Sequence, residues 1–194
     1  MGGPEGFKPD KKIELMGWAP TELRICDFDD DGYPEIFISN CNENALHLRN
    51  GSYIYKKGPD GYSEENRIEL PTHHTMSACC ADINKDGYLD IIVAGFDNNE
   101  ILIFYGSENG FEEEPQRLTL DFSGVKRGVK RGVKSKEPRY MTLADFNNDG
   151  WLDLVVPMID ADYFAILWGS EEGFSTDNVS LIPAEKVLSS RAAD

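Results

Sequence analysis

The sequence predicts an all-β fold, a β-propeller of four-stranded antiparallel blades with three units in this chain and hence part of a propeller. Three observations predict it: an acidic loop that occurs three times, short strand-like segments around each loop, and almost no segment with a helical apolar period. The loops begin 55 and 63 residues apart, and four short strands in a unit of this size are typical of a propeller blade. They read Asp27-Phe-Asp-Asp-Asp-Gly-Tyr-Pro-Glu35, Asp82-Ile-Asn-Lys-Asp-Gly-Tyr-Leu-Asp90 and Asp145-Phe-Asn-Asn-Asp-Gly-Trp-Leu-Asp153.

A second motif accompanies the acidic loops and sets the length of the units. It ends in Gly followed by an aromatic residue, and it reads Tyr105-Gly-Ser-Glu-Asn-Gly-Phe111, Trp168-Gly-Ser-Glu-Glu-Gly-Phe174, Gly58-Pro-Asp-Gly-Tyr62 and Gly3-Pro-Glu-Gly-Phe7. The third acidic loop follows its motif at a greater distance than the first two, because residues 124–136 form a short basic tandem repeat. We interpret this segment as an insertion in a connection between units.

The chain is expected to be a single propeller segment over residues 1–194, with units at about 20–71, 76–120 and 139–183 and partial units at both ends. The partial units indicate a fragment of a longer array, since Arg191-Ala-Ala-Asp194 aligns with Thr142-Leu-Ala-Asp145 at the entrance to a loop. Segments rich in Ile, Val, Phe and Tyr, bounded by Gly, Asn and Asp, predict four strands per unit. The expected strands are Leu23–Cys26, Glu35–Ser39, Ala45–Leu48, Arg67–Leu70, Ser77–Ala81, Leu89–Ala94, Glu100–Tyr105, Gln116–Leu120, Tyr140–Ala144, Leu152–Val156, Phe164–Trp168 and Val179–Ile182.

The composition predicts a globular, acidic protein. Hydrophobic residues make up 40% and charged residues 28% of the 194 residues, which suits a packed core and excludes intrinsic disorder. The net charge of −16 repels a phosphate backbone and attracts cations, so nucleic acid is not an expected partner. No apolar run is long enough for a membrane span, and residues 1–15 lack the apolar stretch of a signal peptide.

The four cysteines are Cys26, Cys41, Cys79 and Cys80. Four cysteines allow three pairings, and the sequence selects none of them. Cys79 and Cys80 are neighbours on an expected strand, where side chains alternate between faces, which disfavours a disulfide between them. We expect the cysteines to be small buried hydrophobic residues rather than a redox pair.

Each acidic loop places oxygen ligands around one point, because its Gly permits a sharp turn that wraps the loop back on itself. This arrangement suits a hard cation, and the absence of His and Cys from the loops disfavours a transition metal. Side chains at positions 1, 3, 5 and 9 of the loop and the backbone carbonyl of position 7 are the candidate ligands. They are Asp27, Asp29, Asp31, Tyr33 and Glu35, then Asp82, Asn84, Asp86, Tyr88 and Asp90, then Asp145, Asn147, Asp149, Trp151 and Asp153.

Two other interpretations of the loops are less favoured. An EF-hand needs a bidentate Glu at position 12, where this chain has Ile38, Val93 and Val156, and its flanking segments would be helices rather than strands. A solvated Asp-Gly turn between strands explains one such loop but not three in register.

The loops and the downstream Tyr-Gly-Ser and Trp-Gly-Ser segments resemble the FG-GAP/VCBS repeats of integrin-type β-propellers. The resemblance covers nearly the whole chain except the basic insertion. It implies a calcium ion in the hairpin between the first and second strands of each blade, three in all, and a binding surface on the opposite face. Two departures are Glu35 in place of Asp at position 9, which weakens the first site in our expectation, and the presence of only three units.

The favoured function is a noncatalytic, calcium-stabilised binding module outside the cell or at its surface, with a protein or glycan as its partner. The alternative is the propeller domain of a carbohydrate-active lyase, dehydratase or hydrolase, because a fold alone excludes no chemistry. Candidate catalytic groups are few. His73 and His74 fall in a polar connection, and adjacent side chains of an extended chain point in opposite directions.

Further partners are expected from the ends of the array and from the insertion. Terminal blades expose apolar faces, which predicts contact with further blades of the same chain or with a second copy. The insertion carries six basic residues and no acid, so it is either a flexible spacer or a contact for an anionic glycan or acidic protein.

Overall fold

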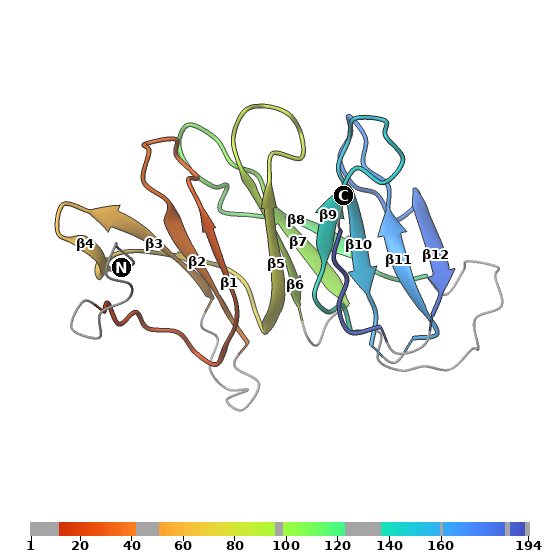
Figure 1. The fold of residues 1–194 in the computed structure, drawn as a ribbon, viewed down its shortest axis with the longest axis horizontal. Coiled ribbons are helices and arrows are strands. Elements are labelled where there is room, and N and C mark those ends of the chain that lie inside the picture. Colours follow the sequence, from red (N-terminus) through yellow and green to blue (C-terminus); the bar gives the residue numbers. More distant parts are fainter. Residues whose placement is uncertain are drawn as a thin grey trace, which may run out of the picture.

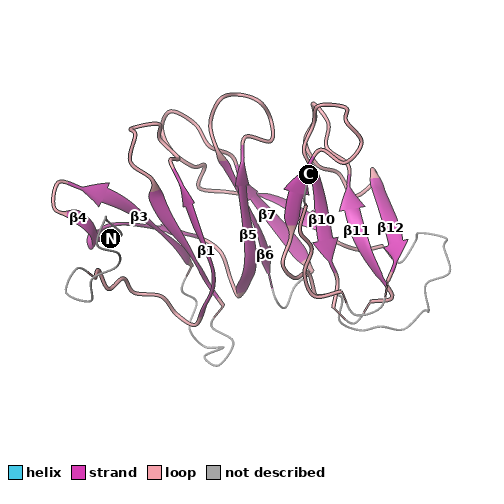
Figure 2. Cartoon of the chain, in the orientation of Figure 1, coloured by secondary structure: helices cyan, strands magenta, loops and turns pink. Residues whose placement is uncertain are grey.

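The computed structural model describes residues 12–41, 51–95, 99–122, 137–159, 161–184 and 187–192. The insertion at 124–136 and the first motif at residues 3–7 lie outside them. The described residues form twelve strands and no helix (Figures 1 and 2). The strands are β1 (Pro20–Cys26), β2 (Glu35–Asn40), β3 (Ser52–Gly58), β4 (Gly61–Leu70), β5 (Thr75–Ala81), β6 (Asp90–Gly95), β7 (Glu100–Phe104), β8 (Gln116–Thr119), β9 (Thr142–Ala144), β10 (Asp153–Pro157), β11 (Tyr163–Leu167) and β12 (Val179–Pro183).

The strands form three four-stranded antiparallel sheets, each in simple sequential order. The first sheet contains β1 to β4, the second β5 to β8 and the third β9 to β12. The sheets follow one another along the long axis of the molecule (Figure 1). The predicted all-β fold of propeller-type four-stranded blades is therefore confirmed.

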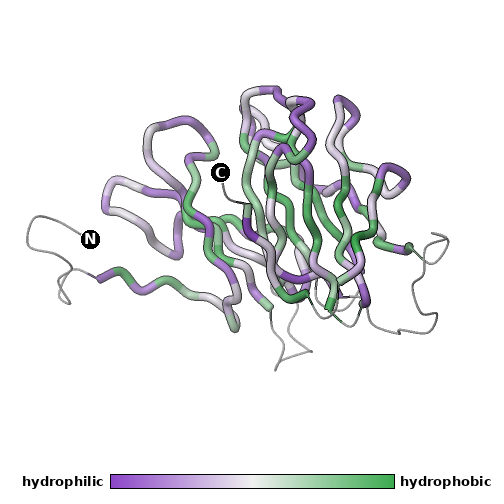
Figure 3. The backbone as a smooth tube through the Cα atoms, turned by 45° about the vertical axis from the view of Figure 1, so that its right-hand side comes forward, coloured by the Kyte–Doolittle hydropathy of each residue, from purple (hydrophilic) through white to green (hydrophobic). Residues whose placement is uncertain are grey.

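The core lies between the sheets. One apolar cluster joins the first and second sheets, including Phe37, Ile54, Ile91 and Val93, and a second cluster joins the second and third sheets. All residues of β6 and β10 are buried. β6 lies in the second sheet, whose two faces meet the first and third sheets. Figure 3 shows the hydrophobic strands inside and hydrophilic loops at the tips.

The first sheet differs from the sequence prediction. The strand expected at Ala45–Leu48 lies outside the described residues, and the third strand is instead β3. Tyr55 of β3 pairs with Ile36 of β2, and a tight turn joins Gly58 to Gly61, so β4 begins six residues before the predicted Arg67. The Gly-aromatic motif of this unit therefore forms a hairpin turn, whereas in the other two units it lies in a longer connection between strands.

The first strands of the sheets lie next to one another. β1 contacts β5, and β5 contacts β9. Residues 187–192 return to β9, where Ser189 bridges Tyr140 in parallel and Thr142 Oγ1 donates to the Ser190 carbonyl at 2.6 Å. This is the register in which the sequence aligns Thr142-Leu-Ala-Asp145 with Arg191-Ala-Ala-Asp194. The described residues include no helix with the length and apolar character needed to cross a lipid bilayer.

Candidate metal centre

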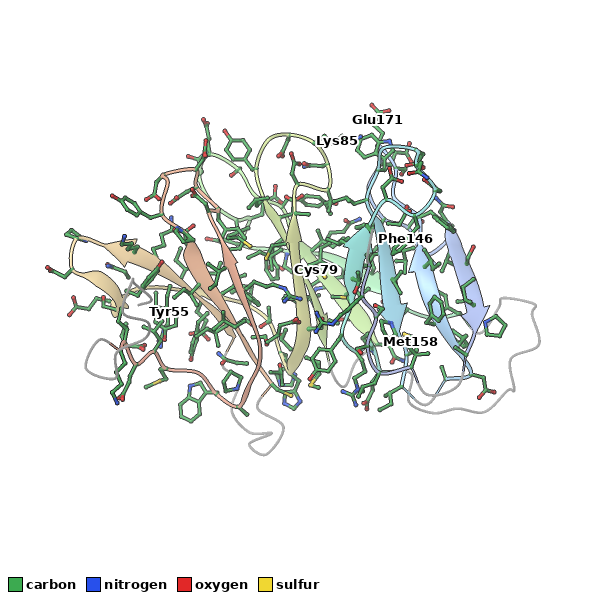
Figure 4. All side chains as sticks on the ribbon, viewed as in Figure 1. Tyr55, Cys79, Lys85, Phe146, Met158 and Glu171 are labelled. Carbon is green, nitrogen blue, oxygen red and sulfur yellow. The ribbon has the colours of Figure 1, made fainter. Side chains whose placement is uncertain are left out.

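The three acidic loops connect β1 to β2, β5 to β6 and β9 to β10 at one edge of the array (Figures 1 and 4). They share one backbone conformation, in which positions 4 and 6 both have positive φ. The values are 54° at Asp30 and 84° at Gly32, 61° at Lys85 and 94° at Gly87, and 58° at Asn148 and 90° at Gly150. Position 6 must turn through the left-handed region, which explains its Gly.

The carboxylate at position 1 holds the turn of each loop. In the second loop, the N–H groups of Asp86 and Gly87 donate to Asp82 Oδ1 at 3.1 Å and to Asp82 Oδ2 at 2.9 Å. Asp27 and Asp145 accept the equivalent pairs of bonds in their own loops. These backbone hydrogen bonds by themselves therefore orient the side chain at position 1 towards the loop interior.

Position 5 adds a second carboxylate in the same orientation. Its Oδ1 accepts the N–H of position 7 in every loop, at 2.7 Å for Asp31, 2.9 Å for Asp86 and 2.8 Å for Asp149. At position 3 the second and third loops carry an amide: Asn84 Nδ2 donates to Asp86 Oδ2, and Asn147 repeats the contact. Side-chain oxygens thus converge within each loop, and the loops contain no His or Cys that could add a nitrogen or sulfur ligand.

The carboxylate at position 9 fastens the loop to the sheet. Asp90 is fully buried, and its two oxygens accept the N–H groups of Ile83 and Gly106, both at 2.9 Å. Asp153 makes the same two bonds in the third unit, to Phe146 and Gly169. These bonds explain the Tyr-Gly-Ser and Trp-Gly-Ser segments, a role that sequence analysis missed.

The glycines in those segments permit this close approach. A Cβ at Gly106 would collide with the carbonyl oxygen of Leu89, and one at Gly169 would collide with that of Leu152. The first unit has no such segment, and Glu35 accepts only one of the two bonds among those described, from the Phe28 N–H at 2.8 Å. The departure at position 9 is therefore coupled to the different turn between β3 and β4.

Electrostatics in the loops reflect both burial and crowding of acids. Burial raises the pKa of Asp90 to about 6, and nearby Asp86 and Asp82 add to the rise. Burial likewise raises the pKa of Glu35 above its ordinary value, with Asp29 contributing. The ionised forms of Asp90 and Glu35 are thus disfavoured in the protein alone and would be favoured by a neighbouring cation.

The first loop brings three carboxylates closest together. Ligand oxygens of Asp27, Asp29 and Glu35 lie within 4.8 Å of one another, a grouping of three acids found nowhere else in the described residues. Oxygens bound to one Ca2+ at 2.3–2.6 Å are separated by at most about 5 Å. The donor set and its span therefore fit a hard cation. The ammonium of Lys56, 2.9 Å from Asp29 Oδ2, lies beside this group.

Lysine side chains lie over the aromatic residues at position 7 of the first and third loops. Lys85 at position 4 of the second loop places its ammonium 3.7 Å from the ring centroid of Trp151 in the third loop (Figure 4 labels Lys85). Lys57 lies over the ring of Tyr33 at 3.9 Å in the first loop. These contacts orient the residues at position 7, whose carbonyls are candidate ligands.

The Gly-Phe end of the second motif packs against the preceding loop. The ring of Phe111, in the second unit, meets Phe28 at position 2 of the first loop edge-on, with centroids 5.3 Å apart. Phe174 of the third unit belongs to the same core cluster as Ile83, at position 2 of the second loop. No further sheet of the described residues packs against Phe146, at position 2 of the third loop, and this side chain is 42% exposed.

The two adjacent histidines are not arranged as the sequence suggested. Their rings stack at 4.0 Å with 16° between their planes, because His74 has a φ of 47° and the chain is not extended there. The expectation that they point in opposite directions was wrong. Neither belongs to a metal-binding group among the described residues.

Comparison with known proteins places this geometry in a family. The FG-GAP-like repeat model matches residues 27–93 and 82–156, which include all three acidic loops. No curated protein matches the chain. The crystal structure of BBS1N in complex with ARL6DN is similar, with a TM-score of 0.55 and 16% identity over 89% of this chain and 46% of that chain. The chain thus spans less than half of that neighbour, and the likeness concerns the fold alone. With more than half of its length matched, the protein belongs to the FG-GAP-like repeat family.

Proposed function

We propose that the protein is a noncatalytic, calcium-stabilised binding module that works outside the cell or at its surface on a protein or glycan partner. The observation that supports calcium most directly is the shared conformation of the acidic loops, in which the carboxylates at positions 1 and 5 are held by equivalent backbone bonds in all three units. Oxygen-only donors of this kind suit Ca2+.

The role of the ion in this proposal is structural. The candidate ligands include ten carboxylates, and those at position 9 are buried beside other acids. Without a cation, ionisation of Asp90 is opposed by burial and by Asp82 and Asp86. A bound divalent cation offsets that repulsion and stabilises the folded state by mass action. Sites of millimolar to submillimolar affinity are filled in extracellular fluid, which is the basis for the proposed location.

The open faces of the terminal sheets are the proposed contacts for further blades or a second copy. Leu23 and Ile25 on β1 are 51% and 62% exposed. By strand register their counterparts in the second sheet are Ala78, fully buried, and Cys80, half-buried against the first sheet. In the second sheet this face is covered by the first sheet. The equivalent face of the first sheet is apolar and exposed.

Calorimetric titration of chelator-stripped protein with calcium tests the proposal. We expect binding to saturate below about 10 mM, the range of extracellular modules. Asp145→Asn in the third loop should remove one site, whereas Asp177→Asn, an exposed acid outside the loops, should leave the stoichiometry unchanged. Absence of heat and of any rise in melting temperature up to that concentration would rule calcium out.

A further inference from the structure

The contact between β1 and β5 is held in a fixed register. Thr21 Oγ1 donates to the Thr75 carbonyl at 2.8 Å, and Arg24 Nε donates to the Ala78 carbonyl at 2.8 Å. Both pairs have the same sequence separation of 54 residues. The strands therefore run side by side in parallel, and the register continues to the ends of both.

The same register places Cys26 opposite Cys80. Both side chains pack against the apolar cluster between the first and second sheets. Both are reduced and half-buried. Cys79 belongs to the cluster on the other face of the second sheet, and the thiol of Cys41 contacts the sulfur of Met76 at 3.2 Å. The four cysteines thus contain one facing pair across a blade interface.

We propose that Cys26 and Cys80 form a disulfide that joins the first two blades when a small-molecule disulfide such as oxidised glutathione is present. One thiolate of the pair attacks the glutathione disulfide, its S–S bond breaks, and one glutathione thiolate leaves. The second thiolate attacks the protein sulfur of the mixed disulfide and releases the other glutathione. Two protein thiols are oxidised, one glutathione disulfide is reduced to two thiols, and the protons of the protein thiols pass through solvent to the glutathione thiolates.

The position of the pair gives the disulfide its effect. Cys26 directly precedes Asp27, and Cys80 lies two residues before Asp82, so the bond would fasten the bases of two acidic loops. A disulfide of about 2.05 Å between facing strands requires the rotation of two short side chains. Cross-linking residues this far apart in sequence restricts the unfolded chain, so the melting temperature should rise by roughly 5 to 10 °C. The proposal requires no bound ion.

A pair of double variants tests it on the full chain. Cys41→Ser/Cys79→Ser keeps only the facing pair, and Cys26→Ser/Cys80→Ser keeps only the other two thiols. After incubation with oxidised glutathione, we expect the first variant to lose both thiols to maleimide labelling and the second to retain both. The melting temperature should rise on oxidation in the first variant alone.

Peptide mapping of the wild-type protein keeps the test independent of how the variants fold. Tryptic cleavage places Cys26 with Cys41 in residues 25–49 and Cys79 with Cys80 in residues 68–85. Fragmentation of the cross-linked peptides under non-reducing conditions should identify the Cys26–Cys80 bond. Persistence of both thiols in the folded first variant, or a wild-type bond to a different cysteine, would overturn the proposal.

Discussion

The ammonium of Lys56 lies 2.9 Å from Oδ2 of Asp29, a candidate ligand in the first acidic loop. Strand register puts Tyr105 and Trp168 at the corresponding positions of the second and third sheets. The first loop therefore has a cation from its own sheet where the other two have an uncharged aromatic side chain. It also has Glu35 at position 9, so both differences should weaken the proposed calcium binding there.

Replacement of Lys56 by Met should strengthen calcium binding at the first loop about threefold to tenfold at low salt. The side chain would keep its length and lose a positive charge that repels the ion, and the pair is partly exposed, which keeps the effect modest. Calorimetry would measure the change. Lys12→Met, at an exposed lysine paired with Glu14, is the control and should leave all affinities as they are. Equal affinities in Lys56→Met and wild type would show that the ammonium does not compete.

Truncation of Phe174 should destabilise the protein far more than truncation of Phe146. Phe174 is 2% exposed and lies in the core between two sheets, whereas Phe146 is 42% exposed. Phe174→Ala should cost about 3 to 4 kcal/mol in the free energy of unfolding and Phe146→Ala less than about 1 kcal/mol. Urea unfolding followed by fluorescence would measure both. Similar costs for the two variants would contradict the packing described for the Gly-Phe motif.

The titration of Asp90 should appear in the pH dependence of stability without calcium. Its folded pKa of about 6 lies above the ordinary value, so the folded protein binds more protons between about pH 4 and 6. The stabilisation from this protonation is fully present below the ordinary pKa and is lost as pH rises through 6. In chelator, the melting temperature of wild type relative to Asp90→Asn should therefore fall from pH 4 to 7. A constant difference across that range would contradict the shift.

Concentration-dependent association should occur through the open face of the first sheet. Ile25 is 62% exposed where its counterpart in the second sheet packs against a neighbour. Ile25→Asp should reduce association in sedimentation experiments, because a buried carboxylate would oppose contact with another sheet. Ile68→Asp, on an exposed residue of the outer strand β4, should have less effect. A wild-type protein that stays monomeric at all concentrations would contradict this proposal.

Sequence periodicity predicted most of the fold because each sheet requires the same pattern of apolar residues in its strands. A second strand enclosed by sheets must be apolar on both faces, and runs such as Leu89–Ala94 reveal it directly. The third strand of the first sheet was missed because its turn differs: Gly58 and Gly61 form a tight hairpin, while the other units continue to a Gly-Phe turn. The alignment of motifs therefore shifted the expected strand to residues outside the described ranges.

The acidic loops were predictable as motifs, but their attachments were not. Nothing in local sequence indicates that the Gly106 N–H reaches Asp90, because the bond depends on how β6 pairs with β7. Lys56 escaped notice for the same reason, since it approaches Asp29 from a strand that lies far along the chain. The facing cysteines depend on contact between separate sheets, which pattern analysis does not give.

Phe28 takes part in two structures at once. Its N–H donates to Glu35 within the loop, while its ring meets Phe111 of the next sheet. Opening of the first loop thus removes part of the surface against which the second sheet packs. Separation of the second sheet in turn exposes the first loop. Amide exchange in these two regions should be correlated, since neither opens alone. Among the described residues no sheet packs against Phe146 of the third loop, which is 42% exposed. This loop lacks the reinforcement and should exchange first, so the array should open from its third sheet.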